Sequence, residues 1–286
     1  MSTTIDNPAL GAHHSEVYFQ RMAASLGDKA RLLDHLVPGH LLDIGAGDGA
    51  LVRLARAAGH TAIGVDATQA AVDHSEGDVM LGTCPGLAQV IDQQPDNIIA
   101  CSVLHEIVSY GGQAAWLAAC MEIGGLLAPG GRLVVRDGVA PTDRYRRQRV
   151  VFADPFEGTA FYRRWLELSA PLGDGRAAQH LMVEDRTVVG PAWAITAFLM
   201  VYTWGWDSLP REAAEDYTIG GSLGAHGYAL EQATGLRLLH LESYAQPGYA
   251  EHLAPRCRLE SAEAGATEPL PWPDTNAIWV LTKDLD

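Results

Sequence analysis

The chain has 286 residues, of which 35 are acidic and 20 basic, so its formal net charge is −15. This length allows one large domain or two small ones, with a sizeable core in either case. The apolar fraction of 48% excludes a disordered chain, and no apolar run approaches the ~20 residues that span a bilayer. Because nucleic-acid binding depends on Lys and Arg, we do not expect this acidic chain to bind nucleic acid or a membrane.

The cysteines predict neither a zinc site nor a redox motif. Cys84, Cys101, Cys120 and Cys257 have no C-x-x-C spacing, so buried free thiols and no metal site are expected. The N-terminus has no basic region followed by an apolar stretch, so no signal peptide is expected. We therefore expect a cytoplasmic protein.

The first part of the chain predicts helices followed by a β-α-β unit. Residues 15–36 show helical apolar periodicity, broken around Gly27, and predict one or two helices. The stretch LLDIGAGDGALVRLARAAG then predicts a short apolar strand, a glycine-rich turn and a helix that Gly59 ends. The next stretch, TAIGVDA, predicts a second buried strand that ends in Asp66.

Two more apolar strands are expected at 96–104 and 131–137, with a helix at 113–127 between them. Strands that alternate with helices predict a parallel sheet with helices on both of its faces. Further along, residues 223–234 predict a helix. LRLLHLESY and NAIWVLTK, separated by a proline-rich loop, predict two strands that form a closing hairpin.

Residues 138–222 do not fit this alternation. They contain two aromatic-rich helical stretches, FEGTAFYRRWLELSA and PAWAITAFLMVYTWGW. This insertion follows the fifth strand, and ligands bind at the carboxyl ends of strands in open α/β sheets. We therefore expect a helical lid or a substrate wall rather than an independent domain.

The segment DIGAGDG, from Asp43 to Gly49, lies on a strand-to-helix turn. Glycines in such a turn let a ligand approach the backbone closely, and the amides of the following helix face that ligand. The spacing is G-x-G-x-G, whereas dinucleotide binding uses G-x-G-x-x-G. Asp43 and Asp48 would repel a pyrophosphate but attract an ammonium group, so a ligand with an amino-acid end fits better than NAD.

This turn, the stretch GVDA and the later stretch LAPGGRLVV resemble the class I S-adenosylmethionine-dependent methyltransferases over about residues 40–137. The resemblance implies a Rossmann-like α/β fold with a seven-stranded, mostly parallel sheet. It implies S-adenosyl-L-methionine as cofactor and S-adenosyl-L-homocysteine as product. In that family the glycine turn holds the methionine part, and the acidic residue that ends the second strand binds the ribose hydroxyls.

A carboxylate suits a vicinal diol because its two oxygens accept two donors side by side. The cofactor-binding residues that the resemblance implies in this chain are Asp43, Gly45, Ala46, Gly47, Gly49, Asp66 and Ala67. The structural alternative is a glycine turn that only closes tightly, with Asp66 capping the helix that follows.

The sequence departs from the family after Asp66. AAVDHSEGDVML leaves no room for the full helix and third strand that normally precede the adenine-binding acidic residue. Asp78 and Val79 then form the adenine site, with Asp78 facing the exocyclic amine, or Asp78 is a solvated turn residue after Gly77. Both interpretations are open.

The stretch Ser102-Val103-Leu104-His105-Glu106 follows the fourth strand, where related enzymes place cofactor-wall and substrate-facing residues. Ser102 and Val103 are therefore candidates for cofactor binding. His105 is a candidate general base because imidazole titrates near neutrality, and Glu106 is a second catalytic candidate. Either residue could instead simply start the next helix. Asp137, which ends the fifth strand, is a candidate for substrate binding.

The aromatic residues of the insertion supply further candidates. The run from Tyr202 to Trp206 is denser in aromatic side chains than packing requires. Tyr202 is a third catalytic candidate, and Trp204 and Trp206 are candidates for substrate binding, whereas Trp193 is expected in the core. A cluster of arginines predicts an anion site or a solvated helix face, and its members are Arg144, Arg146, Arg147 and Arg149.

The expected organisation is a single domain. Residues 1–38 form an N-terminal helical cover, residues 39–137 and 223–286 form the cofactor-binding core, and residues 138–222 form an α-helical lid. We expect methyl transfer to an O, N or activated C atom of a small molecule in specialised metabolism, without a metal ion.

Two other functions stay open: a regulatory or structural cofactor-binding protein without methyl transfer, and a nucleic-acid methyltransferase, which the charge disfavours. The sequence also leaves open whether the chain forms a homodimer.

Overall fold

The computed structural model describes residues 26–172, 175–218, 220–263 and 267–285. The chain divides into two compact units. Unit 1 consists of Met1–Asp137, Gly227–Leu241 and Ile278–Asp286, and unit 2 consists of Gly138–His226 and Glu242–Ala277.

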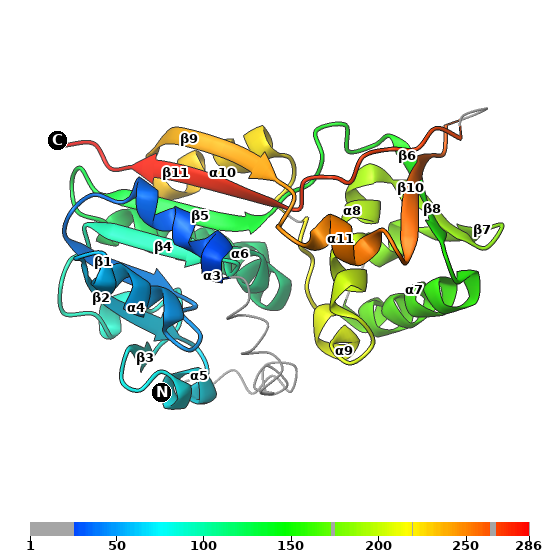
Figure 1. Ribbon diagram of the computed structural model, residues 1–286. Coiled ribbons are helices and arrows are strands. Elements are labelled where there is room, and N and C mark those ends of the chain that lie inside the picture. The colour runs from blue at the N-terminus through cyan, green and yellow to red at the C-terminus, as the bar shows by residue number, and fades with distance from the viewer. Residues whose placement is uncertain (1–25, 173–174, 219, 264–266, 286) are drawn as a thin grey trace. The chain divides into compact units, whose positions relative to one another are not determined.

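A seven-stranded sheet forms the centre of unit 1, in the order β3-β2-β1-β4-β5-β11-β9. Strands β1 to β5 pair in parallel, so that Asp43 on β1 is level with Gly64 on β2 and with Ile99 on β4. Figure 1 shows β11 running in the direction opposite to that of β4 and β5. The strands are β1 His40–Ile44, β2 Thr61–Asp66, β3 Val79–Leu81, β4 Asn97–Cys101, β5 Arg132–Gly138, β9 Arg237–Tyr244 and β11 Asn276–Thr282.

Helices cover both faces of this sheet (Figure 1). Helix α4 packs on β1 and β2, and α6 packs on β4. The helices and 3-10 turns of this part of the chain are α3 Leu26–Lys29, η2 Ala30–His35, α4 Ala50–Ala57, α5 Gln69–His74, η3 Leu87–Gln89, α6 Leu104–Leu126 and α10 Leu223–Thr234. Within the described ranges, no helix has the length and apolar character needed to cross a membrane.

The sequence explains why these elements form where they do. All five residues of β4 are buried, as the apolar run from Asn97 predicts for a strand covered on both faces. Helix α4 buries Leu51, Val52 and Ala55 at helical spacing. Helix α6 is kinked, because the backbone angles of Gly112 (φ 75°, ψ 178°) are not helical.

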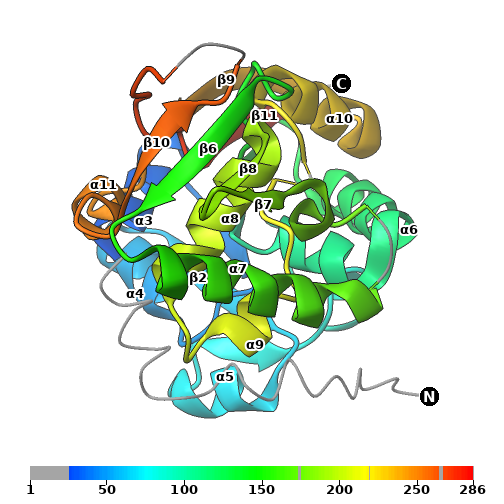
Figure 2. The same cartoon turned by 90° about the vertical axis from the view of Figure 1, so that its right-hand side faces the viewer.

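Unit 2 is built around a four-stranded antiparallel sheet in the order β10-β6-β8-β7. Figure 2 shows β6, β8 and β10 with α7 running below them. Asp154 caps α7, since its carboxylate accepts hydrogen bonds from the amides of Phe156 (2.9 Å) and Glu157 (3.2 Å). The elements are β6 Arg147–Phe152, α7 Pro155–Ser169, η4 Ala170–Leu172, η5 Ala177–His180, β7 Met182–Glu184, β8 Thr187–Pro191, α8 Ala192–Trp204, α9 Leu209–Glu212, α11 Tyr249–Leu253 and β10 Cys257–Ser261.

Unit 2 has a hydrophobic core of its own. It is an aromatic cluster in which Phe198 stacks on Tyr202 at 5.5 Å between ring centroids. Phe161 meets Tyr202 edge-on at 5.0 Å, and Phe152 meets it at 5.7 Å. Such pairs add to the stability that burial of the rings supplies.

The predicted seven-stranded, mostly parallel sheet is confirmed, as are the helices expected at 223–234 and in the two aromatic stretches. The expected α-helical insertion contains helices α7, α8 and α9 and, in addition, three strands, β6, β7 and β8. The fourth strand of the unit 2 sheet, β10, does not belong to the insertion. It lies in the chain between β9 and β11, which are the two strands of the predicted closing hairpin. Of the predicted N-terminal cover, residues 1–25 lie outside the described residues, and α3 and η2 occupy the rest.

Two neighbouring glycines of α6 allow a test of how closely α6 packs against α10 in unit 1. A Cβ atom on Gly124 would lie 1.9 Å from the carbonyl oxygen of Thr234 on α10, whereas a Cβ on Gly125 would meet nothing within 4 Å. Gly124→Ala should therefore destabilise the protein by roughly 1–3 kcal/mol, because the α10 backbone must move. Gly125→Ala should stabilise it by about 0.5–1 kcal/mol through helix propensity.

Urea unfolding midpoints of the two variants and the wild type check this prediction. Equal midpoints for Gly124→Ala and the wild type would contradict the close approach of α6 and α10.

Candidate active site

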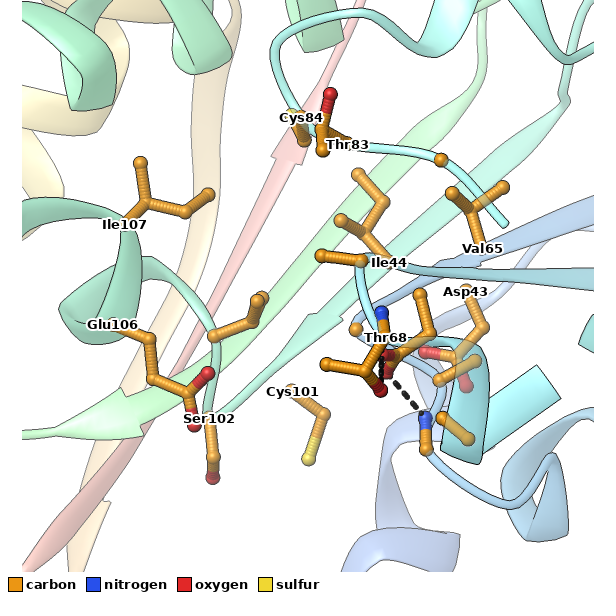
Figure 3. A pocket seen from close by; sticks show the side chains of 18 of the residues that line it. Asp43, Ile44, Val65, Thr68, Thr83, Cys84, Cys101, Ser102, Glu106 and Ile107 are labelled. Carbon is orange, nitrogen blue, oxygen red and sulfur yellow. Dashed lines mark hydrogen bonds between the residues drawn. The ribbon is translucent and has the colours of Figure 1, made fainter. Parts of the chain in front are cut away.

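A cavity of about 390 Å³ opens in unit 1 at the carboxyl ends of β1, β2 and β4. Figure 3 shows Glu106 and Ile107 on one side of it and Val65 and Asp43 on the other. Most of its lining is apolar, including Ile44, Leu51 and Val65, so a ligand with a large organic part fits it.

The glycine turn that follows β1 forms one wall of the cavity. Gly45 (φ +70°) and Gly47 (φ +56°) both have left-handed backbone angles, which favour glycine. A Cβ atom on Gly45 would lie 2.7 Å from Cγ2 of Val103, so this position has no room for a side chain. The amides of Gly45 and Ala46 donate to the carbonyl oxygen of Val65, at 2.8 and 3.2 Å, which fixes the turn on β2.

Asp66, at the end of β2, binds the same turn. One carboxylate oxygen accepts from the amide of Gly47 at 3.0 Å. The other oxygen accepts from the amide of Thr68 at 3.0 Å and from its hydroxyl at 2.7 Å, as the dashed lines of Figure 3 mark. A carboxylate oxygen has room for more than one donor, so Asp66 can also accept hydrogen bonds from a diol in the cavity.

Asp43 is a buried carboxyl group at the bottom of the turn, with 2% of its surface exposed. Its pKa is raised to about 7, chiefly by burial; the ammonium of Lys29 opposes this rise, and the nearby charges of Asp66 and Asp48 add smaller contributions to it. A cationic ligand group would stabilise the ionised form of Asp43.

Most of the predicted cofactor residues line this cavity, and so does the catalytic candidate Glu106. The predicted residues among the lining are Asp43, Gly45, Ala46, Gly47, Asp66, Ala67, Ser102, Val103 and Glu106. The backbone of Ser102 has a positive φ of 56°, and its amide donates to the carbonyl oxygen of Arg136 at 2.6 Å. This bond holds the loop after β4 against β5.

Gly49, Asp78 and Val79 were also expected to bind the cofactor, but they are not among the residues that line the cavity. Asp78 precedes β3, and its carboxylate pairs with Arg53 and Arg56 on α4, whose guanidinium groups lower its pKa against the opposing effect of burial. The interpretation of Asp78 as an adenine-binding residue is therefore corrected. Gly49 begins α4 instead, with a left-handed φ of 77°.

The structure adds lining residues that the sequence analysis missed. The loop after β3 contributes Gly82, Thr83, Cys84 and Pro85, and the start of α6 contributes Ile107 and Tyr110. Leu26 and Lys29 line the cavity from α3. The position of this loop directly after β3 could have identified it as part of the site, but β3 is only three residues long.

His105 and Asp137 form a buried pair, with side chains 5% and 4% exposed. The amide of His105 donates to one carboxylate oxygen of Asp137 at 3.0 Å, and Nδ1 of the ring lies 2.5 Å from the other. His105 is not among the cavity-lining residues, although the next residue, Glu106, is. The contacts of Asp137 argue against its predicted role in binding substrate, because its carboxylate is engaged by His105.

The other predicted residues belong to unit 2. Tyr202 is 1% exposed in the aromatic core, where its hydroxyl donates to Glu157 at 2.5 Å and Arg256 lies 3.8 Å above its ring. Burial and the hydrogen bond to Glu157 raise the pKa of Tyr202. These contacts argue against its predicted catalytic role. Trp206 is 45% exposed and donates to Glu157 at 3.0 Å, and Trp204 is half-buried.

The sequence matches a known protein family. The family profile described as "Methyltransferase domain" covers residues 16–169, which is 154 of the 286 residues. A comparison with curated proteins found no match.

Solved structures of methyltransferases have a similar fold. A chain from the complex between the Haloferax volcanii Trm112 methyltransferase activator and a methyltransferase has a TM-score of 0.50 and 13% identity, covering 98% of this chain and 96% of its own. A SAM-dependent methyltransferase from Methanosarcina mazei has a TM-score of 0.49 and 12% identity, covering 90% and 98%. A TehB-like SAM-dependent methyltransferase from Corynebacterium glutamicum has a TM-score of 0.46 and 16% identity, covering 97% and 100%.

A Rossmann-like sheet, a glycine turn with a buried carboxyl group and a second carboxylate at the end of β2 define a class I S-adenosylmethionine-dependent methyltransferase. The chain belongs to the methyltransferase-domain family, and S-adenosylmethionine is its cofactor. The cavity fits that cofactor, because a Cβ on the lining residue Gly47 would meet nothing within 4 Å, which leaves space for close approach, and because Asp43 can offer a negative charge to an ammonium group.

Removal of the Asp66 carboxylate should weaken cofactor binding. Asp66→Ala deprives the ribose hydroxyls of a charged acceptor, which costs roughly 1.5–3 kcal/mol, or one to two decades of affinity. Asp73→Ala is the matched control, because Asp73 is an exposed carboxylate on the neighbouring helix α5. Calorimetric titration with S-adenosylhomocysteine measures both variants. Equal affinities in the wild type and Asp66→Ala would remove Asp66 from the site.

The raised pKa of Asp43 predicts how stability depends on pH. Because the folded state holds a proton that the unfolded state has lost, the stability contributed by this group is complete below about pH 3.8 and is lost as pH rises through about 7. Asp43→Asn has no such loss. The stability of this variant relative to the wild type should therefore grow between pH 5 and 8, by a few kcal/mol at most.

Urea unfolding without cofactor at pH 5, 6, 7 and 8 checks this dependence. A difference between Asp43→Asn and the wild type that stays constant over that range would show that Asp43 keeps an ordinary pKa.

Proposed function

We propose that this methyltransferase acts on a small-molecule acceptor, at an O, N or activated C atom, in specialised metabolism. The net charge of −15 supports a small acceptor over a nucleic acid, because an acidic chain repels a phosphate backbone. The observation that carries the proposal is the buried His105–Asp137 pair, one residue from the cavity-lining Glu106.

In this proposal Asp137 fixes the proton of His105 on Nδ1. A carboxylate oxygen 2.5 Å from Nδ1 favours the tautomer in which Nδ1 donates, so that Nε2 is the ring nitrogen that can accept a proton. The second hydrogen bond, from the backbone amide of His105 to Asp137, holds the ring and the carboxylate in a common orientation. His105 is then the base, and Asp137 is a positioning residue.

When bound, the cofactor supplies an electrophilic methyl group on a sulfonium. The glycine turn, Asp43 and Asp66 would hold the cofactor, and Nε2 of His105 would take up the proton that the acceptor loses. The protein contributes chiefly alignment, together with a base where the acceptor must lose a proton. Glu106 offers a carboxylate within the cavity that can orient the acceptor.

The lid expected at residues 138–222 stays a prediction, and so does the role of Trp204 and Trp206 in binding the acceptor. The support for that role is the aromatic character of the two side chains. Aromatic side chains bind apolar acceptors and exclude water from the reacting atoms.

The proposed function is tested with cofactor labelled in its methyl group. The purified protein is incubated with separate pools of small phenols, carboxylic acids, amines and β-dicarbonyl compounds, and with tRNA and duplex DNA. Label should appear in at least one small-molecule pool and in neither nucleic acid. Labelled nucleic acid would contradict the proposal, and so would binding of the cofactor with no transfer to any broader collection of small molecules.

His105 should control the rate of transfer rather than the binding of cofactor. His105→Ala should lower the single-turnover rate by about 10²–10⁴-fold, the usual contribution of a general base. The matched control is His74→Ala, which removes an exposed histidine on α5. Asp137→Asn should shift the pH profile of the rate, because the amide no longer fixes the tautomer of His105.

These rates are measured with the acceptor found above, over several pH values. A wild-type rate with a wild-type pH profile in His105→Ala would remove His105 from the mechanism, with Glu106 as the next residue to test.

A further inference from the structure

Two opposite charges line the same cavity in unit 1. Asp43 contributes a buried carboxyl group from β1, and Lys29 contributes an ammonium group from α3. Lys29 is one of only two lysines in the chain, the other being Lys283. The two groups lie close enough that the charge of Lys29 lowers the pKa of Asp43 against the effect of burial.

The segment that carries Lys29 is held in place by a buried ion pair. The neighbouring residue Asp28 binds Arg136 of β5, with its carboxylate 2.6 Å from one guanidinium nitrogen and 3.1 Å from another. The side chains of Arg136 and Asp28 are 3% and 4% exposed. Arg136 also donates to the hydroxyl of Ser102 at 2.9 Å, so α3 is attached to the loop that lines the cavity.

We propose that Lys29 binds the carboxylate of the cofactor's amino-acid end while Asp43 binds its ammonium group. The amino-acid end is a zwitterion, and Lys29 and Asp43 offer one charge of each sign to it. A charge-assisted hydrogen bond in a cavity with an apolar lining is stronger than the same bond in water. The proposal rests on S-adenosylmethionine as the cofactor and on its amino-acid end lying at the glycine turn.

A different role for Lys29 makes a different prediction. If Lys29 served only to balance the charge of Asp43, its removal would act through Asp43 alone. It would raise the pKa of Asp43 further and so would also weaken binding of the ligand's ammonium group. In the Asp43→Asn background, however, Lys29→Gln would then leave cofactor affinity unchanged, so a loss of affinity in that background separates the two roles.

The test compares two ligands that differ only at the amino-acid end. S-adenosylhomocysteine has the carboxylate, whereas 5′-methylthioadenosine has the same adenosine and thioether without the amino acid. Lys29→Gln should weaken S-adenosylhomocysteine about ten- to hundredfold, the loss expected for one charged hydrogen bond. Its affinity for 5′-methylthioadenosine should stay within about twofold of the wild type, since that ligand has no group for Lys29.

Arg31→Gln is the matched control, because Arg31 is a partly exposed cation close to Lys29 in the chain that is not among the cavity-lining residues. It should leave both affinities unchanged, and Lys29→Arg should recover part of the binding that Lys29→Gln loses. All affinities are measured by calorimetry, so no acceptor is needed.

Unchanged or tighter binding of S-adenosylhomocysteine to Lys29→Gln would overturn the proposal. An equal loss of affinity for both ligands would also overturn it, because that result would show that Lys29 only maintains the shape of the cavity. Failure of the wild type to bind either ligand would instead contradict the cofactor assignment itself, and the proposal with it.

Discussion

The hydrogen bond from the amide of Gly47 to the carboxylate of Asp66 joins the two strand ends on which the site depends. It holds a turn whose left-handed glycines no other residue type adopts easily. Gly45 lies against Val103, so the same turn also sets the position of the loop after β4. Through these two contacts the ends of β1, β2 and β4 form one wall of the cavity.

The charges at this wall are arranged for a ligand that is itself charged. A buried carboxyl group is costly unless something compensates it, and in Asp43 burial favours the protonated form. In the proposed arrangement the ammonium group of the cofactor would supply that compensation. Asp66 differs from Asp43, because its oxygens already accept three hydrogen bonds from the protein. These bonds fix the orientation of its carboxylate. Orientation prepared in this way reduces the entropy that binding must overcome.

Local patterns in the sequence predicted the parts of this site that lie on the backbone of long elements. The apolar runs that end at Ile44, Asp66 and Cys101 identified three strands, and the glycine spacing identified the turn between β1 and α4. The ion pairs of Asp78 were not predicted because its partners, Arg53 and Arg56, are one turn apart on α4, and only the folded chain brings them to it. Lys29 carries no motif, so its place in the cavity depends on the long-range pair between Asp28 and Arg136. Strand β6 was missed because its alternating arginines suggested a helix face, whereas the partners that make it a strand are β8 and β10.

A crystal structure of the protein with S-adenosylhomocysteine tests the assignment of this site most directly. Both ribose hydroxyls should lie about 3 Å from the carboxylate of Asp66, and the amino-acid end should lie at Gly45 and Asp43. The adenine should lie near Thr83 and Cys84, beyond the end of β3, and not beside Asp78. A ribose bound away from Asp66, or an amino-acid end bound away from the glycine turn, would contradict the assignment of this site.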